Sequence, residues 1–325
     1  MNAILQTAVN FVLRELDIFF AFSWRDWSTT VIPSFIFSIG AARSSVLPPR
    51  LLFYRYLVLL PWSILFIYSF NLSNQIAGVL EDQMNKPDRP IPSGKVTLEG
   101  AKLRRVVAIS AYLSLSLYFP SILPETICWI LTTAFLNMTA AGHHWFGKNC
   151  VGMVAGTWAQ FSSCWKIISP MTHQGARFVW AIAFWFGLAA HIQDLRDIEG
   201  DAAIGRKTLP IAFGDMRARL LITLIAIPLQ ALALTLGHIG YTGPVPVPLV
   251  LAHVFIAWRV MQAGKGSAYD HKTYMACTSL FDCDLFAMVN SEMPRYSPTH
   301  SVSLLPVRLW DRLYDRGSEI LCTET

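Results

Sequence analysis

Two clusters of polar and charged side chains interrupt an otherwise apolar chain. The first begins at Asn74, reaches Asp82 and continues into a proline-rich loop that carries Lys86 and Arg89. Asn74 and Asp82 are eight residues apart, so on one continuous helix they would lie two turns apart on the same face. Because an uncompensated amide or carboxylate is costly at the end of an apolar span, this cluster indicates a functional site.

The second cluster contains Asp194, Asp197 and Asp201, and Arg206 and Lys207 follow it. This i, i+3, i+7 spacing would place three acids on one helical stripe, where like charges repel unless a cation lies between them. Oxygen-only ligands suit Mg²⁺, which typically binds a few carboxylates together with substrate phosphates. Basic residues beside such a site can hold diphosphate oxygens directly. Two clusters of this kind, facing each other, predict a metal–diphosphate site.

A smaller polar group contains His143, His144, Trp145 and Lys148. Lys148 is a candidate for a further contact to the diphosphate. The alternative for this group, as for each acidic cluster taken alone, is a solvated loop. Two acidic clusters, each followed by basic residues and a Gly/Pro turn, favour the functional interpretation.

The chain that must position these residues is strongly apolar. Of its 325 residues, 54% are hydrophobic and 14% are charged, whereas a soluble domain carries roughly 25% charged residues. We therefore expect an all-α, polytopic transmembrane helical bundle of eight or nine helices, with a central cavity opening to the cytosolic side. Its surroundings are the lipid bilayer, and no nucleic-acid partner is expected. The predicted spans are 27–43, 51–72, 104–120, 121–141, 149–169, 176–193, 217–237 and 244–262, with a ninth possible after Lys272.

Basic residues are distributed unequally between the two sides of this bundle. The loops on the side of both polar clusters hold 14 lysines and arginines, and the opposite loops hold 3. By the positive-inside rule, the loops rich in basic residues face the cytosol. The protein is expected to be an integral, multi-pass membrane protein with a cytosolic active site, in the endoplasmic reticulum if the cell is eukaryotic.

The sequence divides into three parts. Residues 1–22 are predicted to form an amphipathic segment at the membrane surface, because charges interrupt an apolar run there and no cleavable signal is recognised. Residues 23–275 form the predicted transmembrane catalytic domain, and residues 276–325 an atypical polar tail.

The start of this tail does not have the character of a membrane helix. Asp282 and Asp284 interrupt its apolar run, and each would cost roughly 2.5–3.5 kcal/mol at the centre of a span. The segment 273–290 is therefore expected to insert poorly. An altered reading frame near Ala276 would account for such a change.

Both clusters resemble motifs of a known family. NQIAGVLEDQMNKPDRPIPSG (residues 74–94) and DLRDIEGDAAIGRKTLP (residues 194–210) are similar to the first and second motifs of the UbiA prenyltransferase superfamily. The closest likeness is to its fungal branch, which includes aromatic prenyltransferases and UbiA-type terpene cyclases. The resemblance covers approximately residues 28–275. It implies nine transmembrane helices, dependence on Mg²⁺ and a prenyl diphosphate substrate such as geranyl, farnesyl or geranylgeranyl diphosphate.

The resemblance also implies roles for individual residues. It places metal and diphosphate ligands in the first motif and a carboxylate pair in the second, with Asp194 as an additional acid. Lys148 belongs to neither motif and is predicted to contact the diphosphate from its position alone. The predicted metal ligands are Asn74, Asp82, Asp194, Asp197 and Asp201. The predicted catalytic residues are Asp82, Asp197 and Asp201, and the predicted diphosphate contacts are Lys86, Arg89, Lys148, Arg206 and Lys207.

One position departs from the family pattern. Gly78 stands where the first motif normally has its central aspartate. One metal ligand is therefore missing, unless Glu81 supplies a carboxylate in its place.

Two reactions fit these motifs. The first is transfer of the prenyl group to an aromatic or other electron-rich acceptor, such as a phenol or quinol, in terpenoid or meroterpenoid biosynthesis. The alternative is a class I terpene cyclase, in which a double bond of the same prenyl chain attacks the cation. A transporter is less well supported, because the acids gather at one face and do not continue through the bundle.

An allylic cation requires apolar surroundings, and aromatic faces can stabilise it. Trp158, Trp165, Trp180 and Trp185 lie on neighbouring predicted spans and are candidates for this role. Core packing or a place at the membrane interface is the alternative for each of them.

Overall fold

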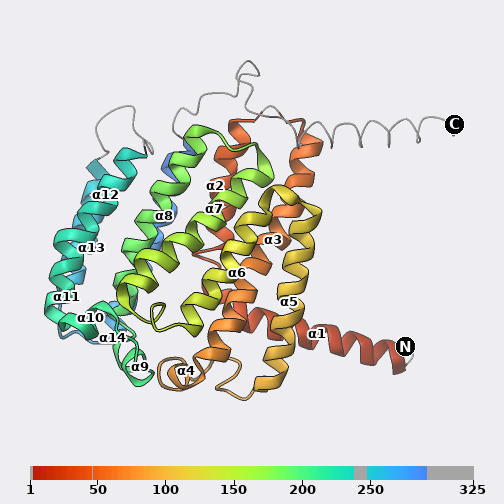
Figure 1. The fold of residues 1–325 in the computed structure, drawn as a ribbon, viewed down its shortest axis with the longest axis horizontal. Helices are drawn as coiled ribbons and strands as arrows, with labels where there is room; N and C mark the ends of the chain where they lie inside the picture. The colour runs from red at the N-terminus through yellow and green to blue at the C-terminus, as the bar shows by residue number, and fades with distance from the viewer. Residues whose placement is uncertain (1–2, 46, 238–246, 291–325) are drawn as a thin grey trace.

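Each stretch predicted to span the bilayer folds as one or more helices in a computed structural model of the protein (Figure 1). The structure describes residues 3–45, 47–237 and 247–290, and no β-strand occurs among them. The predicted all-α bundle is confirmed; residues 244–246 of the last predicted span lie outside the described part. The helices of the first half are α1 (Ala3–Ser23), α2 (Val31–Arg43), α3 (Pro49–Ala77), α4 (Val79–Asn85), α5 (Leu98–Tyr118) and α6 (Leu123–Met138). Those of the second half are α7 (Val154–Ile168), α8 (His173–Asp194), α9 (Ile198–Ala203), α10 (Leu209–Phe213), α11 (Asp215–Leu221), α12 (Ile227–Leu236), α13 (Val247–Val260) and α14 (Ser267–Asn290).

By length and hydropathy alone, only some of these helices could cross a membrane. The stretches that qualify singly are Pro49–Ala77, His173–Asp194 and Asp215–Leu236. α5 and the stretch Pro120–Met138 qualify together, bent against each other by 117°. α7 has only 15 residues, fewer than the roughly 20 that a span needs, and it buries polar residues such as Gln160 and Ser163 inside the bundle. The count of eight full spans stays a prediction.

Local sequence signals account for several helix ends. Thr97 and Thr172 cap α5 and α8, where their side-chain oxygens accept hydrogen bonds from the N–H groups of Gly100 and Gly175 at 3.1 and 3.0 Å. Pro49 begins α3, a position where its missing N–H costs no helical hydrogen bond.

α1 has the extent predicted for the amphipathic segment, and it projects from the polar end of the bundle (Figure 1). Its charged side faces the protein: Arg104 donates to Glu15 at 2.9 Å, and Lys95 donates to Asp17 at 2.9 Å. Phe11 on the same helix is 64% exposed. A place for α1 at the membrane surface stays a prediction.

A helix, α14, forms in the segment after Lys272 where a ninth span was considered possible. α14 runs without interruption over 24 residues and crosses the domain boundary proposed after residue 275. It packs against α2, α8 and α13. Residues 291–325, which make up most of the predicted polar tail, lie outside the described part of the chain.

An apolar face packs α14 into the bundle. Cys277, Phe281 and Leu285 recur at helical spacing and are buried. The ring of Phe281 stacks on Trp185 of α8 with centroids 5.1 Å apart. Asp282 is only half-buried, so its charge does not prevent this packing. Insertion of the segment into the membrane is a separate matter and stays a prediction.

The polar segments gather at one end of the bundle, the lower end in Figure 1, where α4 and α9 pack together. Gly200 of α9 makes this approach possible, because a Cβ there would lie 2.0 Å from Nδ2 of Asn85 in α4. A glycine of the second motif thus brings the two motifs into contact.

Candidate active site

The first motif does not lie on one continuous helix as predicted. α3 ends at Ala77, Gly78 follows with φ −101° and ψ 28°, and α4 begins at Val79. Glycine has a low helix propensity, which favours a break at this position. The N–H of Gly78 still donates to the carbonyl of Asn74 at 2.8 Å. Asn74 therefore stays in the last turn of α3, whereas Asp82 belongs to α4.

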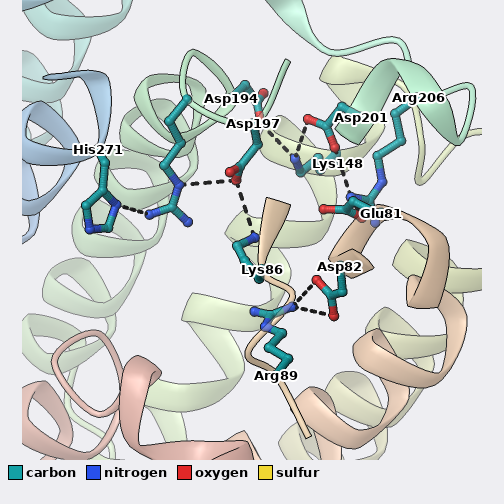
Figure 2. Close-up of polar contacts among 11 residues, drawn as sticks. Glu81, Asp82, Lys86, Arg89, Lys148, Asp194, Asp197, Asp201, Arg206 and His271 are labelled. Atoms are coloured by element: carbon teal, nitrogen blue, oxygen red, sulfur yellow. Dashed lines mark hydrogen bonds and ion pairs between the residues drawn. The ribbon is translucent and has the colours of Figure 1, made fainter. Parts of the chain in front are cut away.

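The second motif is divided as well, so the predicted single stripe of carboxylates is wrong. Asp194 is the last residue of α8, Asp197 precedes α9 and Asp201 lies within α9. All three residues are buried. Asp194 and Asp201 share Lys148 as an ion-pair partner, at 2.6 and 3.9 Å, whereas Asp197 pairs with other cations (Figure 2). The turn between the helices separates like charges that would otherwise repel along one face.

Basic side chains from other parts of the chain bind these acids. The Nη1 atom of Arg89 donates to both carboxylate oxygens of Asp82, at 2.6 and 2.9 Å. Lys148 and Asn149 donate to Asp194 at 2.6 and 2.7 Å. Both residues belong to a π-helical segment (Phe146–Met153) that precedes α7, and such segments often occur at functional sites.

Arg206 joins the two motifs. Its Nη1 atom donates to Glu81 of the first motif at 2.6 Å and to Asp201 of the second at 3.0 Å. Burial raises the pKa of Glu81, and the charge of Arg206 partly offsets this. Burial alone would lower the pKa of Arg206, but Glu81 and Asp201 together raise it. Arg206 is therefore the cation that holds two buried carboxylates together.

Lys86 and Arg196 bind the remaining acid, Asp197, at 3.7 and 3.2 Å. Burial alone would raise the pKa of Asp197, but these two cations lower it. Burial lowers the pKa of Lys86, a shift that the charge of Asp197 opposes. The pair therefore connects the loop after α4 to the turn before α9.

These pairs form the charged end of a cavity of ≈ 140 Å³. Asp82, Asp194 and Asp201 lie behind the cavity wall, each bound to a basic residue that faces the cavity. Gln193 and Glu81 were not among the predicted site residues, although Glu81 was considered as a substitute for the missing motif aspartate. The polar residues lining this end are Asn74, Glu81, Lys86, Arg89, Lys148, Gln193, Asp197 and Arg206.

Lys207, predicted to contact diphosphate, is not brought to the cavity. Its side chain is exposed. Its backbone instead fixes the neighbouring loop: the N–H donates to the carbonyl of His143 at 2.9 Å, and the carbonyl accepts from the N–H of Trp145 at 2.8 Å. A residue adjacent to Arg206 in sequence thus points elsewhere because backbone pairing orients it.

Beyond the charged end, the cavity wall is aromatic. Phe66, Phe70, Trp129, Phe186 and Tyr274 contribute to it. Trp129 stacks on Phe66 and on Phe70, with ring centroids 4.3 and 5.1 Å apart. This wall has the character needed to shield and stabilise a carbocation.

None of the four tryptophans considered as candidates for that role lines this cavity, and core packing was the alternative given for each of them. Trp158 and Trp180 lie against each other, with ring centroids 5.9 Å apart. Trp165 and Trp185 are buried in the core. The prediction identified apolar spans correctly but could not tell which face of each helix points inward. Trp129, which lies in the predicted span 121–141, was missed for this reason.

The donor chemistry at the charged end fits Mg²⁺. Oδ2 of Asp201 is buried without a hydrogen-bond partner among the described residues, and Glu81 shares the Arg206 nitrogen with Asp201. Carboxylate and amide oxygens are ligands that Mg²⁺ accepts. Within the described ranges, no three His, Cys, Asp or Glu side chains are already grouped as a metal site. The acids are held apart by their basic partners, so metal binding requires some of these pairs to open.

Replacing Gly78 with aspartate is expected to lower product formation by about tenfold. Two like charges in contact shift the pKa of a carboxyl group by roughly one unit or more, and one unit corresponds to a factor of about ten. A Cβ at position 78 would lie 3.3 Å from Oε2 of Glu81. The carboxylate of Glu81 therefore occupies the space that a new acid would enter. Product formation at increasing Mg²⁺ concentrations measures the effect.

The controls separate charge from size. Gly78→Ala adds the Cβ alone and should be milder, and Gly78→Asp/Glu81→Gln should recover activity lost in Gly78→Asp. If Gly78→Asp keeps the activity and Mg²⁺ dependence of the wild type, Glu81 does not replace the motif aspartate.

Comparison with known proteins gives one family. The sequence profile described as the UbiA prenyltransferase family matches residues 30–280. Diterpene cyclase eriG of Hericium erinaceus is 56% identical over 270 residues, which cover 83% of this chain and 87% of that protein. Polyprenyl transferase eriF of the same organism is 52% identical over 270 residues, covering 83% and 93%.

Solved structures share the same fold at low identity. A UbiA homologue from Archaeoglobus fulgidus bound to GPP and Mg²⁺ matches 84% of this chain and 99% of its own, with a TM-score of 0.57 and 11% identity. A structure of digeranylgeranylglyceryl phosphate synthase gives a TM-score of 0.53 at 18% identity. The likeness places the charged cavity described above within a known helical architecture.

Proposed function

The chain belongs to the UbiA prenyltransferase family, and on that basis we propose that it ionises an allylic prenyl diphosphate and directs the resulting carbocation within its cavity. One observation carries the proposal: Arg206 joins Glu81 of the first motif to Asp201 of the second, at the charged end of an aromatic cavity. The fold and the apolar helices make the chain an integral membrane protein.

The cavity-facing cations would bind the diphosphate. Lys86, Arg89, Lys148 and Arg206 present donors to the same space, and such charge-assisted hydrogen bonds to phosphate are strong. Their pairing with acids keeps them in position before substrate arrives.

The oxygen donors nearest this space are proposed to hold Mg²⁺. These are Asn74, Glu81 and Asp197, which line it. Asp82, Asp194 and Asp201 lie behind the wall and become available where Arg89, Lys148 and Arg206 turn to the diphosphate. Bound Mg²⁺ would offset the negative charge that develops on the leaving diphosphate.

In the ionisation step the bond between the allylic carbon and the diphosphate oxygen breaks, and its electron pair leaves with the diphosphate. Arg206 and Lys148 would hold the departing group at the charged end. The allylic cation then faces the stacked rings of Phe66, Phe70 and Trp129, which exclude water and stabilise positive charge.

We propose cyclisation as the fate of this cation, with attack by a double bond of the same prenyl chain. The similarity to the protein named diterpene cyclase eriG favours this reaction and favours a C20 substrate, geranylgeranyl diphosphate. Transfer to an electron-rich acceptor, such as a phenol or quinol, is the second candidate. The similarity to the polyprenyl transferase eriF, at 52% identity, supports it.

Removal of divalent metal is expected to abolish product formation, because Mg²⁺ would no longer offset the negative charge that develops on the leaving diphosphate. Membranes containing the protein are incubated with geranyl, farnesyl or geranylgeranyl diphosphate, with and without a phenolic acceptor. Mass spectrometry identifies the products. Activity should fall to background in EDTA and return with millimolar Mg²⁺.

The same experiment distinguishes the two fates. A hydrocarbon formed without acceptor supports cyclisation, and an acceptor adduct supports transfer. Full activity in EDTA, or no consumption of any prenyl diphosphate, contradicts the proposed function.

The charged end is proposed to face the cytosol. The excess of lysine and arginine in the loops at this end supports that orientation. The relatives from a fungus favour the endoplasmic reticulum as the membrane concerned.

A further inference from the structure

A carboxylate outside both motifs also lines the cavity. Asp26 ends a short 3₁₀ turn (Trp24–Asp26) that precedes α2. Asn71 of α3 is buried and donates to Oδ2 of Asp26 at 2.8 Å, and to the carbonyl of Phe22 at 2.9 Å. The second of these bonds fixes the Asn71 amide, so the Asp26 carboxylate has a defined position.

Asp26 differs from the other acids that line this cavity in its partners. Glu81 is bound by Arg206 at 2.6 Å, and Asp197 has two basic partners. Asp26 forms no ion pair within 4.0 Å among the described residues, and its carboxylate receives the neutral amide of Asn71. The side-chain partner of Asp26 is therefore a neutral amide, whereas those of Glu81 and Asp197 are cations.

Asp26 lies in the cavity that is proposed to hold the carbocation. Asn71 follows Phe70 on α3, and both line the cavity together with Tyr274 of α14. Phe70 stacks on Trp129 at 5.1 Å. Asn74, one turn further along α3, belongs to the charged end. Asp26 therefore lies where the aromatic wall meets the diphosphate site.

We propose that Asp26 is the base that accepts the proton lost when the carbocation reaction ends, and that Asn71 is its positioning residue. This inference rests on the proposed function. After the new carbon–carbon bond forms, a C–H bond next to the cationic centre breaks. Its electron pair forms the C=C bond, or restores the ring of an aromatic acceptor, and the proton goes to the carboxylate of Asp26 and then to water. Cyclisation to a hydrocarbon and transfer to a carbon of an aromatic ring both end with this step.

Asp26→Asn tests the proposal, because it keeps the shape of the side chain and removes its basicity. We expect product formation to fall by about 100- to 10,000-fold, the usual range for loss of a general base. Diphosphate release should fall much less, and prenyl alcohols formed by water capture should replace the missing product. Asp26→Glu should restore part of the product, and Asn71→Ala should shift the same product-to-alcohol ratio in the same direction.

Asp17→Asn is the matched control, since Asp17 is an exposed aspartate of α1 that pairs with Lys95; it should change neither readout. An unchanged product-to-alcohol ratio in Asp26→Asn overturns the inference while leaving the proposed function intact. Absence of diphosphate release from the wild type overturns the proposed function itself. If Asp26→Asn and Asp26→Glu both lose the monodisperse peak in size-exclusion chromatography, Asp26 is needed for folding and the inference is wrong.

Discussion

Replacing Asp197 with alanine is expected to lower product formation by about 100- to 1,000-fold, the scale on which single groups that stabilise transition-state charge contribute. Asp197 lines the cavity and is bound by Lys86 and Arg196. Its removal deletes an oxygen donor of the proposed metal site. It also leaves the partly buried Lys86, whose pKa burial already lowers, without the acid whose charge opposes that shift.

Asp82→Ala should have a comparable effect by a different route, since it frees the Arg89 guanidinium from its two hydrogen bonds. Single-turnover diphosphate release measures the ionisation step in both variants. Asp17→Ala, at an exposed ion pair in α1, is the matched control and should stay near wild type. Near-wild-type release by folded Asp197→Ala or Asp82→Ala contradicts the assignment.

Arg206→Met is expected to cost both activity and stability. The change keeps most of the side-chain volume but leaves Glu81 and Asp201 facing each other without their shared cation. Removing one partner of a buried ion pair typically costs about 3–5 kcal/mol. We expect a lower melting temperature in detergent and loss of detectable product.

The effect of Mg²⁺ on the melting temperature of this variant tests whether a metal binds between the two carboxylates. If Glu81 and Asp201 belong to a cation site, millimolar Mg²⁺ should raise the melting temperature of Arg206→Met more than that of the wild type. Lys207→Met is the control, because Lys207 is adjacent in sequence and exposed. Equal stabilisation of Arg206→Met and wild type by Mg²⁺ argues against a metal between the two carboxylates.

Hydropathy was sufficient to predict the helical bundle, because each apolar stretch must bury its backbone polar groups in helical hydrogen bonds. It failed at the ends of helices. The break at Gly78 and the turn before Asp197 depend on local backbone preference and on repulsion between acids, which a spacing rule does not include. Hydropathy also did not show how α14 packs, because the buried position of Phe281 depends on Trp185, about a hundred residues earlier in the chain.

The motifs located the charged end of the site, because residues close in sequence remained close in space. Partners from distant segments could not be predicted in this way. Asp26 carries no motif around it, and it reaches the cavity because Asn71 of α3 holds it. Lys207 shows the converse, since its place beside Arg206 gave no information about the direction of its side chain.

The break after Ala77 and the end of α8 at Asp194 have an electrostatic consequence. Both long helices end at the same space, and the carboxyl end of a helix carries about half a negative elementary charge from its aligned peptide dipoles. Two such ends favour cations and disfavour a bare anion. A diphosphate would therefore be drawn in as a complex with its counterion, and the backbone of α3 and α8 would itself set the order in which the ligands arrive.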